Sequence, residues 1–579
     1  MAVSMKAACY ALSFSALNAV VFSHAHANPI NGYPVSDEQL EAVASSLHSK
    51  TTASLRTADY FNLDRFRKPD NYQHPPLQQA PVKRVNPQTG ELTTSLTADY
   101  LEYDFTSFKD NQAFTKRLRL RKYNQQTVGD TLVARPGDTL KIRLTNQLPP
   151  ESHPPCNEDG NCNHNQPHNF NTTNLHTHGL HVDPTGNSDN VFIKLQSGDS
   201  FDYEIKIPEN HVAGTFWYHA HVHGGSSVQV GSGMSGALII KGDYDRLPAM
   251  RNADEKIMML QEIAFNDDGE IENNDTFAPV AWAEQAADRG WHISINGQVM
   301  PEIKLQPGEV ELWRFIHAGV RKNVKLALLD PCSGNRLPLV QVAADGIPST
   351  TKRLSDDNSV LMAPGYRNDV MLKVHRRGTY YLVDEEVGPV ELGAQYCFLN
   401  PENQQFSLDD SAQNILARVT VRGQREFEHF PLNAALASLN RPRSIDDSEL
   451  SSIVEYLEFD IDISVDPWLG LINGKPYDPN QPRILKLNTA QTWEISSVFS
   501  HHPYHIHVNP FEVIFRDESG QIVDRIWKDT ILVDELNDAQ TNTVEVRSRY
   551  EDFTGAFVTH CHILDHEDHG MMEKVVIEP

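Results

Sequence analysis

A turn followed by an alternating strand occurs three times in this 579-residue chain. The copies begin at Arg135, Gln306 and Lys486, at intervals of about 170 residues. Each strand alternates apolar and polar residues with the period of two that is typical of a half-buried β-strand. Asn-Gly turns follow Ile295 and Ile472, at a similar distance upstream of the second and third copies. The spacing is too wide for a solenoid and favours three related β domains, although any β protein produces some units of this kind.

Length and composition set the expected boundaries of these domains. A chain of this length exceeds one ordinary core, so roughly two to four domains are expected. Residues 28–95 are polar and weakly patterned, which predicts an N-terminal extension. Pro431, Pro442 and a run of charged residues are typical of a connecting segment. We therefore predict β domains at residues 96–245, 246–425 and 453–579, with a linker at 426–452.

The N-terminus has the pattern of a secretory signal peptide. A lysine, Lys6, precedes a mostly apolar stretch that ends at Phe22, and Ala25 and Ala27 form a small-x-small cleavage pattern. We predict cleavage after Ala27 and a periplasmic or secreted mature protein; a retained membrane anchor is the alternative. No later stretch offers about 18 consecutive apolar residues, so we expect no membrane span.

Charge and histidine content narrow the classes of partner. The 50 basic residues against 77 acidic ones give a formal net charge of −27, which excludes the basic surface that nucleic-acid binding requires and favours cations, including metal ions. The chain has 26 histidines and only 6 cysteines, which rules out a small disulfide-rich scaffold. A metalloprotein needs such a histidine excess, but only the positions of the histidines can indicate one.

Histidines are concentrated in closely spaced pairs. Five His-x-His pairs follow the predicted signal peptide, where chance supplies about one. Residues i and i+2 of a strand face the same side, so each pair can present two imidazoles to one metal site. The pairs lie in four segments: His176–His178, His219–His223, His505–His507 and His560–His562.

The last segment carries the most specific pattern. Cys561 is followed by His566 and Met571, and His502 precedes the third segment. Two histidines, a cysteine thiolate and a weak axial methionine form the ligand set of a blue-copper electron-transfer site. A zinc site with one cysteine and two histidines is the alternative for the same residues. Met571 considered alone is more often a core residue, and only its offset from Cys561 favours a ligand role.

The four segments together resemble the copper-binding motifs of the multicopper oxidases, a family that includes laccases, ascorbate oxidases, bilirubin oxidases and cuprous-ion oxidases. The resemblance covers roughly residues 100–579. It implies an all-β fold of three cupredoxin-like Greek-key β-sandwich or barrel domains and four copper ions as cofactors. The implied ligands are His502, Cys561, His566 and axial Met571 for type 1 copper, His176 and His505 for type 2, and His178, His219, His221, His507, His560 and His562 for the type 3 pair.

Two acids resemble positions that family members use as proton donors. Reduction of O₂ to water consumes protons, so a buried cluster requires carboxylic acids as well as metal. Asp189 lies shortly after the first histidine pair and Glu567 directly follows His566. The alternative for each is a solvated surface acid. Four histidines exceed the pattern and are expected to support ligands or to lie at the surface: His181, His223, His501 and His569. Since His223 extends its motif to three alternating histidines, it leaves open which two of them bind.

The remaining cysteines lie outside the copper motifs. Cys156 and Cys162 flank a short polar loop, which favours a disulfide. The alternative is a labile metal-loading site that uses His153, His164 and His168. Cys332 and Cys397 are candidates for a second bridge, but their separation in the chain leaves that pairing open.

The reductant is less constrained than the cofactor. The 11 methionines are scattered, without the methionine-rich segment with which cuprous-ion oxidases bind Cu(I), so we expect an organic reductant such as a phenol or aromatic amine, with O₂ as the acceptor. An axial methionine implies a lower-potential type 1 site and easily oxidised substrates. The acidic charge keeps oxidation of Cu(I), Fe(II) or Mn(II) as the alternative. Two hypotheses place the chain in another functional class: a non-catalytic copper-binding protein on the same fold, and a copper nitrite reductase.

Overall fold

The computed structural model of the protein describes residues 33–34, 72–109, 112–156, 162–266, 268–272, 292–386, 388–390, 392, 396–397, 414–424, 433–536 and 542–579. The predicted signal peptide and most of the predicted extension at 28–95 lie outside this part of the chain. The described residues form six β-sheets that pair into three sandwiches, in agreement with the all-β prediction. Helices are short, and none of those described is long and apolar enough to cross a membrane.

The first sandwich combines a sheet of order β2-β5-β10-β9-β7 with one of order β4-β3-β6-β8. Its strands are β2 Val82–Arg84, β3 Glu91–Lys109, β4 Gln112–Tyr123, β5 Gly129–Ala134, β6 Thr139–Asn146, β7 His176–His178, β8 Ser200–Lys206, β9 Gly214–His219 and β10 Ser235–Ile240. A buried helix, α2 Ser226–Ser232, lies between β9 and β10, and a 3-10 turn, Tyr244–Arg246, with α3 Pro248–Asn252 leads out of the sandwich.

The middle sandwich combines a sheet of order β1-β18-β17-β20-β14-β11-β12 with one of order β13-β22-β21-β15-β16, where β19 also pairs with β15. Its strands are β1 Tyr33–Pro34, β11 Asp254–Ile263, β12 His292–Ile295, β13 Glu302–Leu305, β14 Val310–His317, β15 Val324–Asp330, β16 Asn335–Leu337, β17 Val340–Ala344, β18 Ile347–Leu354, β19 Val360–Met362, β20 Arg367–Lys373, β21 Gly378–Asp384 and β22 Ile415–Val421.

The third sandwich combines a sheet of order β24-β23-β26-β31-β28-β29 with one of order β25-β33-β32-β27-β30. It follows α4 Asn433–Leu436 and a 3-10 turn at Asp447–Glu449. Its elements are β23 Leu450–Asp462, β24 Leu469–Ile472, β25 Arg483–Lys486, β26 Thr489–Ser497, β27 His502–Ile506, β28 Phe511–Arg516, β29 Ile522–Lys528, β30 Thr530–Val533, β31 Val544–Tyr550, β32 Gly555–Cys561, α5 Leu564–Asp568 and β33 Met572–Glu578.

The strands of the predicted sequence repeat occupy equivalent places in the three sandwiches. These strands are β6, β14 and β26. Each lies inside its sheet, parallel to one neighbour and antiparallel to the other. The parallel neighbours are β3, β11 and β23, and the antiparallel neighbours are β8, β20 and β31. The turn-and-strand unit therefore marks one position of a common sheet topology.

Two predicted boundaries fall inside strands. β3 begins at Glu91, where it pairs with Thr139 of β6, so a strand crosses the expected boundary between residues 95 and 96. β23 begins at Leu450, three residues before the expected start of the third domain. Polar residues on the solvent side of both strands weaken the apolar pattern, which explains the displaced boundaries. β1, within the expected extension, adds an edge strand to the middle sandwich through β18.

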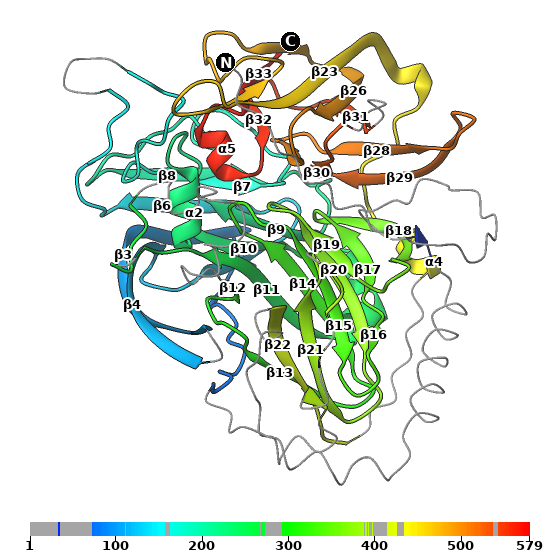
Figure 1. The fold of residues 1–579 in the computed structure, drawn as a ribbon. Coiled ribbons are helices and arrows are strands. Elements are labelled where there is room, and N and C mark those ends of the chain that lie inside the picture. Colours follow the sequence, from blue (N-terminus) through cyan, green and yellow to red (C-terminus); the bar gives the residue numbers. More distant parts are fainter. Residues whose placement is uncertain are drawn as a thin grey trace, which may run out of the picture.

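Apolar packing joins the middle and third sandwiches. One continuous core cluster includes Trp313 of β14 and Trp493 of β26, both fully buried, and extends to Cys561 at the end of β32. The first sandwich has its own core cluster between its two sheets. Figure 1 shows β7 and α2 of the first sandwich beside α5 and β32 of the third. This contact between the first and third sandwiches holds most of the histidine motifs.

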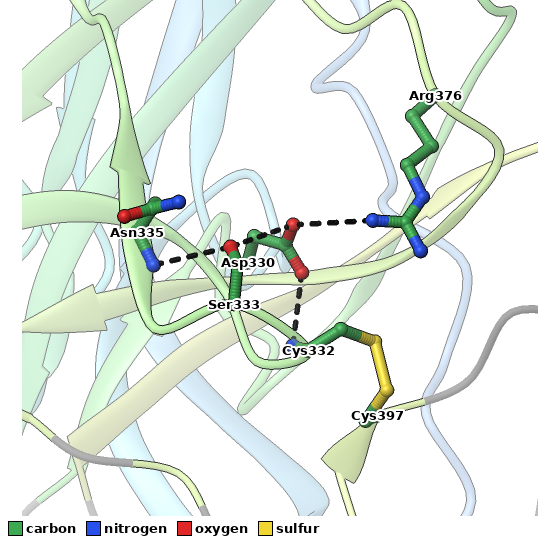
Figure 2. The surroundings of a disulfide bond; sticks show 6 residues. All are labelled: Asp330, Cys332, Ser333, Asn335, Arg376 and Cys397. Carbon is green, nitrogen blue, oxygen red and sulfur yellow. Dashed lines mark hydrogen bonds and ion pairs between the residues drawn. A yellow bond between two sulfur atoms is a disulfide. The ribbon is translucent and has the colours of Figure 1, made fainter. Parts of the chain in front are cut away.

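Two disulfide bonds are present. Cys156 and Cys162 form one, as predicted, and Cys332 and Cys397 form the other. Figure 2 shows the second bridge beside Asp330, which accepts a hydrogen bond from the Cys332 backbone N–H at 2.9 Å and lies 4.0 Å from Arg376. Cys561 is the free cysteine among the described residues, and it is buried.

Candidate metal centres

Two pairs of neighbouring strands bring the four histidine segments together. β7 and β9 are antiparallel in the first sandwich, with His176 opposite His219. β27 and β32 are antiparallel in the third, with His505 opposite His560. Cross-strand partners in such a ladder face the same side of the sheet, so each pair of strands presents a patch of imidazoles. The two patches meet at the contact between the sandwiches.

The patches form one buried group, which we call the eight-histidine cluster. Its members are His176, His178, His219, His221, His505, His507, His560 and His562. Rings from the two sandwiches stack directly: His176 lies 3.8 Å from His507 and His178 lies 3.9 Å from His505, measured between ring centroids. Burial lowers the pKa of all eight imidazoles, so they are neutral and can offer lone pairs.

Short distances between ring nitrogens divide the cluster further. His221 Nε2 and His507 Nε2 lie 3.1 and 3.3 Å from His560 Nε2. His562 Nε2 lies 3.3 Å from His178 Nδ1. Ligands at about 2.0–2.1 Å in a tetrahedral arrangement stand roughly 3.3 Å apart, so these separations match nitrogens that share a metal ion.

The opposite ring nitrogens are held by hydrogen bonds. His219 Nδ1, His560 Nδ1 and His505 Nδ1 donate to backbone carbonyls of Ala220, Cys561 and Asp529 at 3.0, 2.9 and 2.8 Å, respectively. In this tautomer the Nε2 atom carries the lone pair. Three inward nitrogens, Nε2 of His176, His219 and His505, are buried without a partner among the described residues. The donor set therefore fits metal ions.

The second group, which we call the cysteine cluster, lies within the third sandwich. His502 begins β27, Cys561 ends β32 and His566 lies in α5. Their candidate ligand atoms all lie within 4.8 Å of one another, and all three residues are buried. Burial raises the pKa of the Cys561 thiol, so its thiolate requires a cation. A thiolate with two imidazoles fits copper.

Met571 is attached to the cysteine cluster through its backbone. Its N–H donates to the His566 carbonyl at 2.9 Å, and its carbonyl accepts from the Cys561 N–H at 3.1 Å. The side chain is fully buried in the core cluster that contains Cys561. Its axial contact with a metal stays a prediction.

The two acids are not solvated surface groups, because both are buried beside histidines. Asp189 accepts hydrogen bonds from His176 Nδ1 at 3.0 Å and from the Thr177 N–H at 2.8 Å. Burial raises the pKa of Asp189 to about 7. Glu567 lies 3.6 Å from both His221 Nδ1 and His560 Nδ1. Burial, followed by the charge of Asp568, raises the pKa of Glu567 well above its ordinary value.

A buried ion network that the sequence did not reveal supports the cluster from the middle sandwich. Arg367 Nη1 of β20 donates to Asp529 Oδ1 at 2.8 Å, and Lys528 Nζ lies 2.9 Å from Asp345. The Asp529 carboxylate lies 3.2 Å from His178 Nε2. The backbone carbonyl of Asp529 accepts a hydrogen bond from His505 Nδ1. These residues carry no motif, because only the fold brings Arg367 to Asp529.

Serines of α2 hold the acids of α5. Ser226 Oγ donates to Glu567 at 3.1 Å, and the Ser227 N–H donates to Asp568 at 2.9 Å. Burial raises the pKa of Asp568 to about 7. No sequence signal pointed to α2 as part of the site, because its residues match no metal motif.

The four surplus histidines lie outside the eight-histidine cluster. His181 contacts Asp552, His501 contacts Asn323, and His569 stacks on Trp468 with ring centroids 3.9 Å apart. His223 lies against Tyr477, with a centroid distance of 4.9 Å. His219 and His221 are therefore the two histidines of that motif that face the cluster.

Comparisons with known proteins agree with this geometry. Sequence profiles described as "Multicopper oxidase" match residues 163–245 and 452–579. The multicopper oxidase mco of Staphylococcus aureus is 23% identical over 465 residues, covering 79% of this chain and 83% of that protein. A laccase of Haloferax volcanii is 25% identical over 429 residues, covering 70% and 67%. The solved multicopper oxidase from Campylobacter jejuni, described as a metallo-oxidase, aligns with a TM-score of 0.64 at 21% identity and covers 89% of this chain and 98% of its own.

The chain belongs to the multicopper oxidase family. Its three sandwiches are cupredoxin-like, it is an oxidoreductase, and its cofactor is copper. The zinc, nitrite reductase and non-catalytic readings are not favoured by these relatives.

Proposed function

We propose that this protein couples one-electron oxidation of phenols or aromatic amines to the four-electron reduction of O₂ to water, using four copper ions. The cysteine cluster would hold type 1 copper, with Met571 as a further ligand. In the eight-histidine cluster, His176 and His505 would hold type 2 copper, and the other six histidines would hold the type 3 pair. The observation that carries this proposal is the division of the cluster by its nitrogen distances into His221, His507 and His560, and His178 with His562.

Copper at these sites would supply the one-electron steps, and the protein supplies the route between them. Cys561 of the cysteine cluster is covalently joined to His560 and His562 of the eight-histidine cluster. His560 and Cys561 end β32, His562 follows directly, and all three are buried, so the path is short and excluded from water. The rigid sheet fixes its geometry between oxidised and reduced states.

Asp189 and Glu567 hold protons at the two sides of the eight-histidine cluster. Asp189 orients His176 through the ring Nδ1, and Glu567 stands between His221 and His560. A carboxylic acid whose pKa is raised toward neutral pH keeps a transferable proton there. The two acids thereby place transferable protons beside the cluster, and because each turnover consumes four protons, both acids must be reprotonated during it.

An organic reductant is supported by the apolar rim of the cysteine cluster. Trp468 lies edge-on to His566, with ring centroids 5.4 Å apart. Val498 and Phe499, just before His502, are 43% and 38% exposed. Aromatic and aliphatic groups on loops beside an electron-entry site favour an aromatic substrate over a hydrated cation. Metal-ion oxidation remains the second candidate, because the net charge of −27 favours cations.

We also propose that the mature protein is periplasmic or secreted. The signal-peptide pattern that ends at Ala27 supports this location. The two disulfides support it as well, because they persist in oxidising compartments.

Oxygen uptake by the copper-loaded mature protein tests the function. A phenol, an aromatic amine, Cu(I) and Fe(II) are compared side by side, with the copper-free protein as control. We expect a blue protein with four coppers that consumes O₂ fastest with the organic donors. Dominant Cu(I) or Fe(II) turnover would reverse the proposed substrate class, and a colourless protein with fewer than four coppers would refute the oxidase.

A further inference from the structure

A separate histidine group lines a cavity between the first and third sandwiches. The cavity has a volume of about 280 Å³, and its lining includes His164, His168 and His223 together with Tyr477 and Met572; His221 of the eight-histidine cluster also borders it. None of the first three histidines belongs to the eight-histidine or the cysteine cluster. They are also absent from the copper motifs as the family resemblance assigns them.

His168 has the hydrogen bonding of a metal ligand. The side chain is buried, and its Nδ1 donates to the Gln166 carbonyl at 2.6 Å. The proton is thereby fixed on Nδ1, which leaves the lone pair on Nε2. Histidines that bind metals are commonly held through the other ring nitrogen in this way.

His223 is a partly buried residue whose two ring nitrogens are buried and have unused hydrogen-bonding capacity. Both ring nitrogens are inaccessible to solvent and without a hydrogen-bond partner among the described residues. The backbone of His164 approaches the ring without completing a hydrogen bond. Packing against Tyr477 accounts for the position of the ring but satisfies neither nitrogen. Such a buried polar group is unfavourable unless a water molecule or an ion completes it.

The ring spacing suits a shared metal ion. The centroids of His168 and His223 lie 5.8 Å apart, with ring planes at 85°, and His164 lies 6.0 Å from His168. Two imidazoles on one metal at about 2.0–2.1 Å place their centroids roughly 5–6 Å apart. Rings of the eight-histidine cluster show similar values, such as 5.0 Å between His178 and His562.

The lining selects the class of ion. The side chains offer imidazole nitrogens, and the described residues that line the cavity include no carboxylate. Nitrogen ligands suit late first-row metals rather than Ca²⁺ or Mg²⁺. Lys194, exposed at the edge of the cavity, opposes a cation and weakens the site. An exchangeable ion is therefore expected, in contrast to the buried clusters.

We propose that His168 and His223, with His164 at the mouth, bind one additional late first-row transition-metal ion, Cu(II) or Zn(II), separate from the copper clusters. The sequence offered His153, His164 and His168 as an alternative metal-loading site, and the structure changes the members of that set. His153 packs against Phe170, with ring centroids 4.3 Å apart and ring planes at 32°, and His223 takes its place in the proposed site. The Cys156–Cys162 disulfide closes the preceding loop without using these histidines.

Zn(II) added to the copper-loaded protein tests this site. Equilibrium dialysis measures the added zinc, and X-ray absorption at the zinc edge counts its imidazole ligands. We expect one exchangeable Zn(II) with at least two imidazoles at about 2.0 Å. A zinc shell of oxygen ligands alone, or no bound zinc, would overturn the proposal without use of any variant.

Variants then locate the ion. His168→Gln and His223→Gln should each weaken zinc binding more than about 10-fold, while the control His153→Gln leaves it unchanged. Lys194→Gln should tighten binding, because it removes an opposing charge. Unchanged blue absorption and copper content show that a variant is folded. Zinc affinity that is unaffected in folded His168→Gln and His223→Gln proteins would contradict the proposal, and oxygen uptake with the phenol independently reports on the proposed function.

Discussion

The two metal clusters are built in different ways. The cysteine cluster takes His502, Cys561 and His566 from the third sandwich alone. The eight-histidine cluster takes four histidines from the first sandwich and four from the third, and stacked rings such as His176 on His507 join them. All residues of the cysteine cluster come from one sandwich, whereas the eight-histidine cluster forms only when two sandwiches dock. Electron entry and oxygen chemistry should therefore be separable by substitution.

Loss of the thiolate gives the largest expected effect. Cys561→Ser removes the sulfur ligand and should abolish both the blue absorption and turnover of phenols. The eight-histidine cluster has its own ligands, so its three coppers should remain. Absorption spectra with copper analysis measure both results. A Cys561→Ser protein that lost all copper would show that the clusters are not independent.

Asp189→Asn should act on the other cluster. The amide cannot donate the carboxyl proton, so reoxidation of the reduced protein by O₂ should slow by about 100-fold, the lower range for a general acid. The blue absorption and the rate of reduction by a phenol should be unchanged. Stopped-flow absorbance separates the two half-reactions. Asp202→Asn, at an exposed aspartate paired with Arg143, is the control. Reoxidation at the wild-type rate would contradict the assignment of Asp189.

Loss of Arg367, which lies in the middle sandwich, should affect only the eight-histidine cluster. Arg367→Met removes the cation beside Asp529, which holds His178 and His505, so copper affinity at that cluster should fall by about 10- to 100-fold. The cysteine cluster should keep its colour. The ratio of copper content to blue absorbance measures whether copper is lost from the eight-histidine cluster alone.

A matched control for Arg367→Met exists between the same two sandwiches. Arg353 Nη2 pairs with Asp524 at 2.6 Å, also from the middle to the third sandwich, and among the described residues this pair makes no hydrogen bond to the eight-histidine cluster. Arg353→Met should leave the ratio of copper to colour unchanged. An equal loss of copper in both variants would mean that docking in general, rather than support of the histidines, determines copper binding.

The smallest effect is expected outside both clusters. Burial lowers the pKa of Lys122 in β4 to about 7, so the unfolded chain binds this proton more tightly than the folded one. The free energy of unfolding should therefore rise between about pH 7 and pH 10 by roughly 1 kcal/mol per pH unit from this group. In Lys122→Met this contribution is absent, and copper content is unchanged. Urea unfolding of the copper-free variant and wild type at pH 7.5 and pH 9.5 measures the free energy of unfolding of each protein. An equal change with pH in the two proteins would contradict the role of Lys122.

Short sequence patterns predicted those features of the site that depend on residues close together in the chain. His-x-His on strands and the offset of Met571 from Cys561 are short-range signals, and the repeated turn-and-strand unit marks one strand position in each sandwich. Contacts between distant segments had no such signal. Arg367 and Asp529 are 162 residues apart, and no spacing rule connects them.

The same limit explains what the sequence left open. Three alternating histidines at His219, His221 and His223 could not be divided by spacing, because period two places all three on one face. The chain leaves β9 at His219, and the residues beyond it no longer follow strand geometry, so His223 turns to the cavity beside Tyr477. The surroundings of Glu567 likewise depend on docking, because Ser226 and His221 of the first sandwich lie beside it.

Anomalous diffraction at the copper edge from crystals of the loaded protein tests the central claim most directly. We expect one peak among His502, Cys561 and His566, and three peaks within the eight-histidine cluster, divided among its ligands as the nitrogen distances indicate. A single metal in the eight-histidine cluster, or no metal beside Cys561, would contradict the account of two separate copper centres.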